Sequence, residues 1–459
     1  MAPSDWEVLM IVTRLAKFTA GLAYDTLPDT VRHAAKRCLL DWLGAVICGS
    51  PVPPATLMTK ALADELGHGR ARLVPSGQQA PLRTAALING TAAHAMEVDD
   101  IFQDGVYHPG PPVIAAALAA AQHAGASGAE LLTAIVAGYE ASNPVAAAMQ
   151  PAHYDFWHTT GTVGTIGAAA GAARALGLDA EKTGHAMANS VTMAAALQQA
   201  FLADAMAKPL HAGHAAEAGA TAALIASAGI TGAPNMLEGE RGFGAAMSRD
   251  VDWDGAVAKL GEDFTITRMT QKNHTCCGHS FAGIDAALYL REHEGLKAED
   301  VKSITVASYA KAVELCGNPD PKTVYEAKFS LPFSVAVALI TGAARFDAFR
   351  AERLADPVIR ALMAKVTVVL DDTAEAAFPG RRSATVTVAT TDGRRLERYA
   401  PTRKGDPDDP LTDAELEAKY RDLAAPVIGD EAAGRLAETI WQVERQPSIG
   451  ELGVVSSGK

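Results

Sequence analysis

The sequence predicts a mostly α-helical protein with a large all-helical domain and a smaller domain that mixes helices with strands. Two observations lead to this prediction. From about residue 4 to residue 249, Ala- and Leu-rich segments of helical length are separated by short runs of Gly, Pro, Asn and Ser. Beyond about residue 264, several runs alternate β-branched with polar residues, which is typical of strands.

The helical region contains seven clear segments. We expect helices at residues 29–49, 83–96, 112–124, 129–149, 162–176, 180–201 and 212–228. Small residues occur on several faces of these segments, which suits helices that are packed closely on all sides.

The later region contains the strand signals. We expect strands at 302–309, 365–372 and 384–400, with helices between them at 280–294, 325–341 and 347–364. The last strand run contains Asp392-Gly393, which favours a hairpin turn because Gly accepts a positive φ. A further helix is predicted after Thr412, which has capping-box spacing to Glu415. We therefore assign residues 1–265 and 405–459 to the helical domain and 266–404 to the α+β domain.

Composition excludes several classes of protein. The 459 residues are 49% hydrophobic, so the chain can bury a large core and is not a disordered protein. The net charge of −13 opposes nucleic acid and anionic membrane surfaces as partners. The apolar runs are too short or too interrupted to span a bilayer. The N-terminus, with Asp5 and Glu7, lacks a basic leader, and the five cysteines do not form a disulfide framework, so we expect a cytoplasmic protein.

The first segment that could carry chemistry runs from the end of one helix to the start of the next. It places Glu97, Asp99 and Asp100 before a loop that presents His108. A histidine beside carboxylates can act as an acid or base near neutral pH. The alternative is that the acids cap turns or pair with Arg and Lys while His108 lies on a surface loop.

The second segment begins with His158, immediately before a predicted helix. Gly161, Gly164 and Gly167 suggest a dinucleotide motif, but no strand precedes them, so close helix packing explains them better. Free N–H groups at the helix start would favour an anion such as a carboxylate beside His158. The alternative is a histidine that caps the helix.

Two further segments carry cations. Lys208 precedes Pro209 at a break between apolar helices, so it either reaches solvent or binds an anion. His211 and His214 follow at i, i+3 spacing, which is weak evidence for metal without a third ligand. The loop from Lys272 also holds candidates for zinc or for nucleophilic catalysis: His274, Cys276, Cys277 and His279. Adjacent cysteines cannot easily both reach one tetrahedral ion, so we expect no metal site there.

The order of these segments resembles the MmgE/PrpD family, which includes 2-methylcitrate dehydratase, cis-aconitate decarboxylase and iminodisuccinate epimerase. The resemblance covers the full length and rests on short motifs. They are NGTAAHAMEVDD, the following His108-Pro109, GYE at 138–140, HTTGTVGTIGAAA after Trp157, AKPLHAGHAA around Lys208, GFG at 242–244, the CCGH loop, EAKFSLPFSVA at 326–336 and PLTDAELEAKY at 410–420.

The resemblance implies a homodimer, with a helical domain built from both chain ends and a smaller α+β lid domain. It also implies a small polycarboxylate substrate and no organic cofactor or obligatory metal. The site residues carried over are Glu97, Ile101, His108, His158, Lys208, Lys272, Cys277 and Phe333. Lys208 and Lys272 would neutralise carboxylates, and the two histidines would move protons. Asp99, Asp100 and His279 would orient a histidine, shape the loop or contact the substrate.

Three positions depart from the decarboxylase pattern. Ile101 stands where the decarboxylase has a Thr, Phe333 where it has a Tyr, and Cys277 where it has a His. We therefore expect a cofactor-independent lyase that dehydrates a 2-methylcitrate-like hydroxy acid. The alternatives are an epimerase of an amino- or imino-dicarboxylate, a cis-aconitate-type decarboxylase, a non-catalytic carboxylate-binding protein and a zinc protein.

Overall fold

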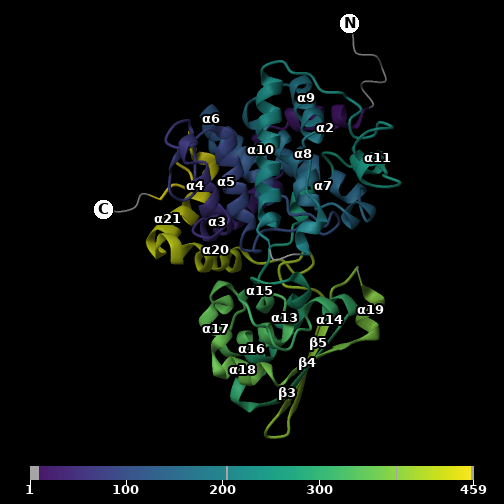
Figure 1. Ribbon diagram of the computed structural model, residues 1–459, viewed down its shortest axis with the longest axis vertical. Coiled ribbons are helices and arrows are strands. Elements are labelled where there is room, and N and C mark those ends of the chain that lie inside the picture. Colours follow the sequence, from purple (N-terminus) through teal and green to yellow (C-terminus); the bar gives the residue numbers. More distant parts are fainter. Residues whose placement is uncertain (1–9, 203–204, 379, 456–459) are drawn as a thin grey trace. The chain divides into compact units, whose positions relative to one another are not determined.

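The computed structural model describes residues 10–202, 205–378 and 380–455, and the chain divides into two compact units. Unit 1 comprises residues 1–270 and 416–459, and unit 2 comprises residues 271–415. Figure 1 shows that unit 1 is built from helices, whereas unit 2 combines helices with a sheet. The predicted mostly α fold class is confirmed. Asp5 and Glu7, used above to interpret the N-terminus, lie outside the described residues.

The helices of unit 1 follow the predicted segments closely. They are α2 (Ile11–Gly21), α3 (Asp29–Gly49), α4 (Ala55–Ala61), α5 (Leu82–His94), α6 (Gly110–Ala124), α7 (Gly128–Ala148), α8 (Thr159–Ala175), α9 (Ala180–Val191), α10 (Ala207–Ser227), α11 (Phe243–Met247), α12 (Trp253–Val257) and α21 (Asp430–Trp441). Helix α20 (Asp413–Ile428) begins in unit 2 and continues into unit 1. A two-residue ribbon, β1 (Ala71–Arg72) with β2 (Gln79–Ala80), is a small departure from an all-helical unit.

The predicted helix 180–201 is wrong in its second half. Helix α9 ends at Val191, and a single 3-10 turn follows at Gln198–Phe201. Between them the chain pairs with the segment before α8: the His158 N–H donates to the Ala196 carbonyl at 3.0 Å. Tertiary pairing therefore overrides the local helical propensity of this Ala-rich stretch.

Glycines allow the helices of unit 1 to approach closely. A Cβ at Gly213 of α10 would lie 2.0 Å from Thr91 Oγ1 and 2.4 Å from the Leu87 carbonyl of α5. In α8, a Cβ would lie 2.4 Å from Ala196 Cβ if placed on Gly161, and 2.6 Å from Ser142 Oγ if placed on Gly167. All three glycines are close-packing positions, and for Gly161 and Gly167 this confirms the prediction from the sequence.

Unit 2 contains a four-stranded sheet in the order β4-β3-β5-β6. The strands are β3 (Val301–Ser308), β4 (Val366–Leu370), β5 (Ala384–Thr390) and β6 (Arg395–Ala400), which confirms the predicted strand runs. β3 and β4 are parallel, and the other neighbours are antiparallel. The turn between β5 and β6 contains Gly393 at φ +92°, as the Asp392-Gly393 hairpin signal predicts.

The helices of unit 2 cover this sheet in shorter pieces than predicted. They are α13 (Phe281–His293), α14 (Ala310–Cys316), α15 (Val324–Ala327), α16 (Leu331–Thr341), α17 (Ala351–Ala355), α18 (Pro357–Met363) and α19 (Asp372–Ala377). The predicted helix 325–341 is interrupted because Ser330 caps a new helix by accepting the Phe333 N–H at 3.2 Å. Asp356 likewise caps α18 and divides the predicted helix 347–364.

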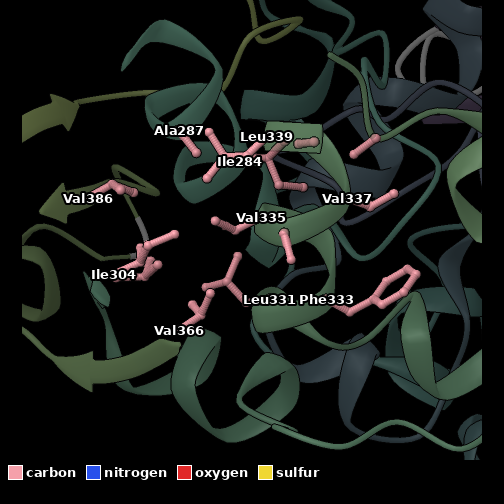
Figure 2. Packing of buried hydrophobic residues seen from close by; sticks show 14 of the residues in the cluster. Ile284, Ala287, Ile304, Leu331, Phe333, Val335, Val337, Leu339, Val366 and Val386 are labelled. Atoms are coloured by element: carbon pink, nitrogen blue, oxygen red, sulfur yellow. The ribbon is translucent and has the colours of Figure 1, made fainter. Parts of the chain in front are cut away.

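The core of unit 2 lies between the sheet and two helices. Figure 2 shows Ile304, Val366 and Val386 of the sheet on the side of α16 that carries Leu331 and Val335. Ile284 and Ala287 of α13 pack in the same cluster. This apolar cluster fixes the helices that flank the Cys-containing loop.

The contact between α5 and α10 predicts a stability effect. Gly213→Ala should lower the stability of the protein by about 1–3 kcal/mol, because the new methyl group meets backbone and Thr91. Gly184→Ala in α9 is the matched control, since the nearest atom to its Cβ is Ala16 Cβ at an ordinary 3.5 Å. That control should be neutral or slightly stabilising. Thermal unfolding midpoints measure both, and equal midpoints for the two variants would contradict the packing argument.

Candidate active site

A buried ion pair fixes the start of the acidic loop in unit 1. The Lys419 ammonium of α20 donates to Asp41 Oδ1 of α3 at 2.6 Å and to the Val98 carbonyl at 2.7 Å. Both side chains are almost completely buried. Burial raises the pKa of Asp41, and the neighbouring Lys419 opposes that rise. The backbone at Val98, where the acidic loop begins, is therefore held in place by α20, and through Asp41 it is linked to α3.

Asp100 fixes the other side of the loop. Its Oδ1 accepts the Gly110 N–H at the start of α6 at 2.9 Å, and its Oδ2 accepts the Tyr139 hydroxyl of α7 at 2.7 Å. Burial raises the pKa of Asp100 to about 7. These contacts join the loop to α6 and α7.

Asp99 lies between two imidazoles. His94 Nδ1, at the end of α5, forms a 2.9 Å hydrogen bond with Asp99 Oδ2. His108 Nδ1 lies 2.9 Å from the same oxygen. His94 and Asp99 are buried, whereas 15% of the His108 side chain is exposed. The backbone N–H of His108 also donates to Thr160 Oγ1 of α8 at 3.2 Å, which fixes the loop opposite Asp99.

His158 extends this cluster from the start of α8. Its ring stacks against His94 at a centroid distance of 5.6 Å, and its Nδ1 lies 3.2 Å from His211 Nδ1 of α10. It occupies the N-cap position without a side-chain capping bond, so the capping interpretation is wrong. Burial, helped by the nearby His94 and Lys208, holds the pKa of His158 well below its usual value. Burial likewise lowers the pKa of His211 to about 4.

The structure therefore brings four imidazoles together in one cluster, in which His94 and His108 contact Asp99. Sequence alone predicts His108 and His158 as site residues, but it does not indicate His94, and it suggests His211 only as a metal ligand. His94 stands in the Ala-rich run NGTAAHAM, where a single histidine resembles an ordinary helix residue. The only sequence signal for His94 is that it lies five residues before Asp99. That spacing brings the two side chains together only because the chain turns after α5.

Lys208 lies in the first turn of α10 and forms an ion pair with Glu97. Its ammonium lies 5.7 Å from the centre of the Phe201 ring, which itself meets the His158 ring edge to face at 4.9 Å. Glu97 has φ +60°, a left-handed conformation that is uncommon outside glycine. Ile101 pairs with Thr270 through two backbone hydrogen bonds of 2.9 Å.

The remaining predicted residues belong to unit 2. Lys272 and Phe333 are buried there, and Cys277 is half-buried, with its N–H donating to the Lys328 carbonyl at 2.9 Å. Figure 2 shows Phe333 on the side of α16 away from the labelled sheet residues, where its ring lies 5.8 Å from Phe349. His279 Nδ1 lies 2.7 Å from the Tyr309 hydroxyl, and burial lowers the pKa of His279 to about 3.

The Cys-containing loop does not gather a set of metal ligands. His274 Nε2 pairs with Asp285 at 2.8 Å, whereas His279 pairs with Tyr309. Among the described residues, the group of three that could hold a metal is instead His94, Asp99 and His108, whose ligand atoms lie within 4.8 Å of one another. Burial raises the pKa of the Cys276 thiol, which disfavours a nucleophilic thiolate there.

The cysteines and the longest apolar helices can be compared with the class of protein that the composition predicts. All five cysteines are free thiols. In the part of the chain that the structure describes, no helix is both long and apolar enough to cross a bilayer.

Comparisons with known proteins place these residues in a family context. The model of the MmgE/PrpD N-terminal domain matches residues 13–256, and that of the C-terminal domain matches residues 274–445. A cis-aconitate decarboxylase-like protein of Aspergillus oryzae is 26% identical, with 98% of each chain covered. Human cis-aconitate decarboxylase is 28% identical, with 92% of this chain and 90% of the relative covered. The Aspergillus terreus cis-aconitate decarboxylase is 22% identical, with 96% and 95% covered.

The buried Lys419 predicts a large stability effect. Lys419→Met should destabilise the protein by about 3–5 kcal/mol, because it leaves Asp41 buried without its cation. The double variant Asp41→Asn with Lys419→Met should recover part of that loss. Arg435→Ala removes an exposed ion pair with Glu431 and is the control, with an expected change below about 1 kcal/mol. Urea unfolding measures all three, and a wild-type midpoint for Lys419→Met would contradict the prediction.

The raised pKa of Asp100 predicts that its contribution to the free energy of unfolding depends on pH. Its pKa rises from 3.8 to about 7 on folding, so between about pH 4 and pH 7 the folded protein holds a proton that the unfolded chain releases. Its contribution to stability is therefore greatest at low pH and falls as the pH rises, by at most about 1.4 kcal/mol per unit. Asp100→Asn should be least stable relative to wild type near pH 4, and the difference in unfolding free energy should shrink up to about pH 7. Urea unfolding across this range tests the trend, and a pH-independent difference would refute it.

Proposed function

We propose that this chain, which belongs to the MmgE/PrpD family, is a lyase that acts on a small di- or tricarboxylate by histidine-mediated proton transfer. The reaction that we place first is the dehydration of a 2-methylcitrate-like hydroxy acid. The observation that carries the proposal is the pairing of a partly exposed His108 with the buried carboxylate of Asp99, beside a second, buried histidine, His158.

His108 is the proton carrier in this proposal. When its Nε2 takes a proton from the substrate carbon, the Asp99 carboxylate 2.9 Å from Nδ1 stabilises the imidazolium that forms. As the C–C double bond forms, the C–O bond breaks, and the leaving hydroxyl takes the proton from the His108 imidazolium and departs as water. One residue thereby serves both halves of the elimination, and the net products are an alkene and water.

His158 has a different task. Because burial keeps its pKa low, it is a neutral imidazole at neutral pH and not a reservoir of protons. One of the facing nitrogens of His158 and His211, 3.2 Å apart, donates to the other. If His211 donates, His158 keeps its own proton on Nε2, and this N–H can stabilise the negative charge that develops on the substrate.

Lysine and arginine side chains of each unit support the choice of a carboxylate substrate, and in unit 1 the cation near the histidine cluster is Lys208. Lys208 already holds the Glu97 carboxylate, and we propose that a substrate carboxylate competes with Glu97 for this ammonium. Lys272 is a second, buried lysine in unit 2. The Nε of Arg382 in unit 2 is buried and has no hydrogen-bond acceptor among the described residues, so an anion there would offset a desolvation cost.

Decarboxylation of cis-aconitate is the second candidate, because relatives covering almost the whole chain carry that name. The same His108–Asp99 pair would then give its proton to the carbanion left by carbon dioxide. Ile101, Cys277 and Phe333 argue against it, since they lack the polar groups that the decarboxylase pattern has at these positions. Epimerisation of an amino- or imino-dicarboxylate would need proton exchange without loss of a group.

A substrate panel tests the proposal. With 2-methylcitrate or citrate we expect alkene absorbance to appear without release of carbon dioxide. His108→Gln should lower kcat by about 10²- to 10⁴-fold. His153→Gln is the matched control, because His153 is a buried imidazole of unit 1 bonded to Met247 and Thr162, outside the cluster. It should leave kcat close to that of wild type.

The outcomes of the panel separate the candidates. Carbon dioxide released from cis-aconitate, with no dehydration of the hydroxy acids, would replace the first candidate by the second. Deuterium incorporated from solvent without elimination would favour the epimerase. No turnover and no proton exchange with any of these acids would overturn the lyase proposal.

A further inference from the structure

We infer that His94, which the proposed mechanism does not use, is a positioning residue: it holds Asp99 in place and thereby selects the tautomer of His108. The kinetic part of this inference rests on the proposed function, because it assumes that His108 moves the proton. The structural part concerns which nitrogen of His108 carries hydrogen, and it can be tested without any substrate.

The position of His94 is set by a helix. It is the last residue of α5, and its side chain is fully buried. Helix α5 packs against α3, α6 and α10, so the ring of His94 has little freedom to move. Asp99, in contrast, lies on the loop that follows. A hydrogen bond of 2.9 Å from His94 Nδ1 to Asp99 Oδ2 therefore ties a loop carboxylate to a rigid element.

The chemistry of Asp99 decides where the protons lie. An ionised carboxylate accepts hydrogen bonds and cannot donate them. His94 Nδ1 forms a hydrogen bond with Asp99 Oδ2 at 2.9 Å, whereas His108 Nδ1 lies 2.9 Å from the same oxygen without hydrogen-bond geometry. A hydrogen on Nδ1 of each ring would face the carboxylate, and this is the tautomer that an ionised Asp99 favours. The Nε2 of His108 is then left with a lone pair, which is the form that a general base requires.

His94 is also the ring that joins the two catalytic histidines. It meets His108 edge to face at 5.0 Å and stacks on His158 at 5.6 Å with an interplanar angle of 22°. Removing the ring would therefore free the Asp99 carboxylate to rotate and would also remove the support between His108 and His158. A residue with a purely structural role would need only to fill this space.

Three substitutions separate donation from space filling. His94→Asn keeps an N–H donor near the position of Nδ1, whereas His94→Ala removes both donor and ring. Asp99→Asn removes the acceptor that we propose fixes His108. His153→Asn is the matched control, since it shortens another buried imidazole of unit 1 that does not contact Asp99.

Nitrogen-15 NMR of histidine-labelled protein reads the tautomer directly. The His108 signal is assigned by its loss in His108→Gln. We expect wild type, His94→Asn and His153→Asn to show His108 as a single neutral form protonated on Nδ1. We expect His94→Ala and Asp99→Asn to show a mixture that includes protonation on Nε2.

Kinetics supply the second readout. His94→Ala should lower kcat about 10- to 100-fold while KM changes less than about threefold, because substrate contacts remain and the base is misprotonated. His94→Asn should recover most of kcat. If His94→Ala does not fold, the His94→Asn and Asp99→Asn spectra still decide the inference.

Two results would overturn the inference. One is a His108 spectrum that stays in the wild-type form in His94→Ala or in Asp99→Asn. The other is a His94→Asn variant that loses the Nδ1-protonated form of His108. A wild-type protein with the expected spectrum but no turnover would instead refute the proposed function and leave the positioning role of His94 supported.

Discussion

The buried ion pair between Lys419 and Asp41 is the interaction on which the arrangement of unit 1 around the acidic loop depends. The Lys419 ammonium is bonded to Asp41 and to the Val98 carbonyl, so it joins α3, α20 and the loop that carries Asp99 and Asp100. An ion pair buried this deeply is costly to break, because either partner left behind would be a desolvated charge. Helix α20 therefore supports the loop that carries Asp99, although Lys419 lies 321 residues from Val98.

Three buried carboxylates lie near this point, and the environment of each one is different. Asp41 faces a lysine, Asp99 faces two imidazoles, and Asp100 faces a tyrosine hydroxyl and a backbone N–H. Burial raises the pKa of Asp100 to about 7, so at neutral pH part of it is protonated. The net charge of −13, which opposes anionic macromolecules, does not reveal this local arrangement.

Local sequence was sufficient to predict the elements whose ends are marked by capping or turn residues. Helix α3 has the predicted bounds, and the hairpin at Asp392-Gly393 and the Thr412–Glu415 capping box form as expected. The end of α9 could not be predicted, because the pairing of His158 with Ala196 decides it. The ion pair between Glu97 and Lys208 could not be predicted either, because the two residues are 111 positions apart and only the fold brings them together. His94 was missed because only the fold shows what its ring contacts.

The abundance of small residues is a condition for the chemistry as well as for the packing. His94, His158 and His211 come from α5, from the residue before α8 and from α10, so their rings meet only if these helices lie close together. A Cβ at Gly161 would lie 3.1 Å from the Cβ of His211, and one at Gly213 would collide with α5. Larger residues at these two positions would push α8 and α10 outward and separate the imidazoles. The composition that first predicted tightly packed helices is therefore also what permits one carboxylate and four imidazoles to share one site.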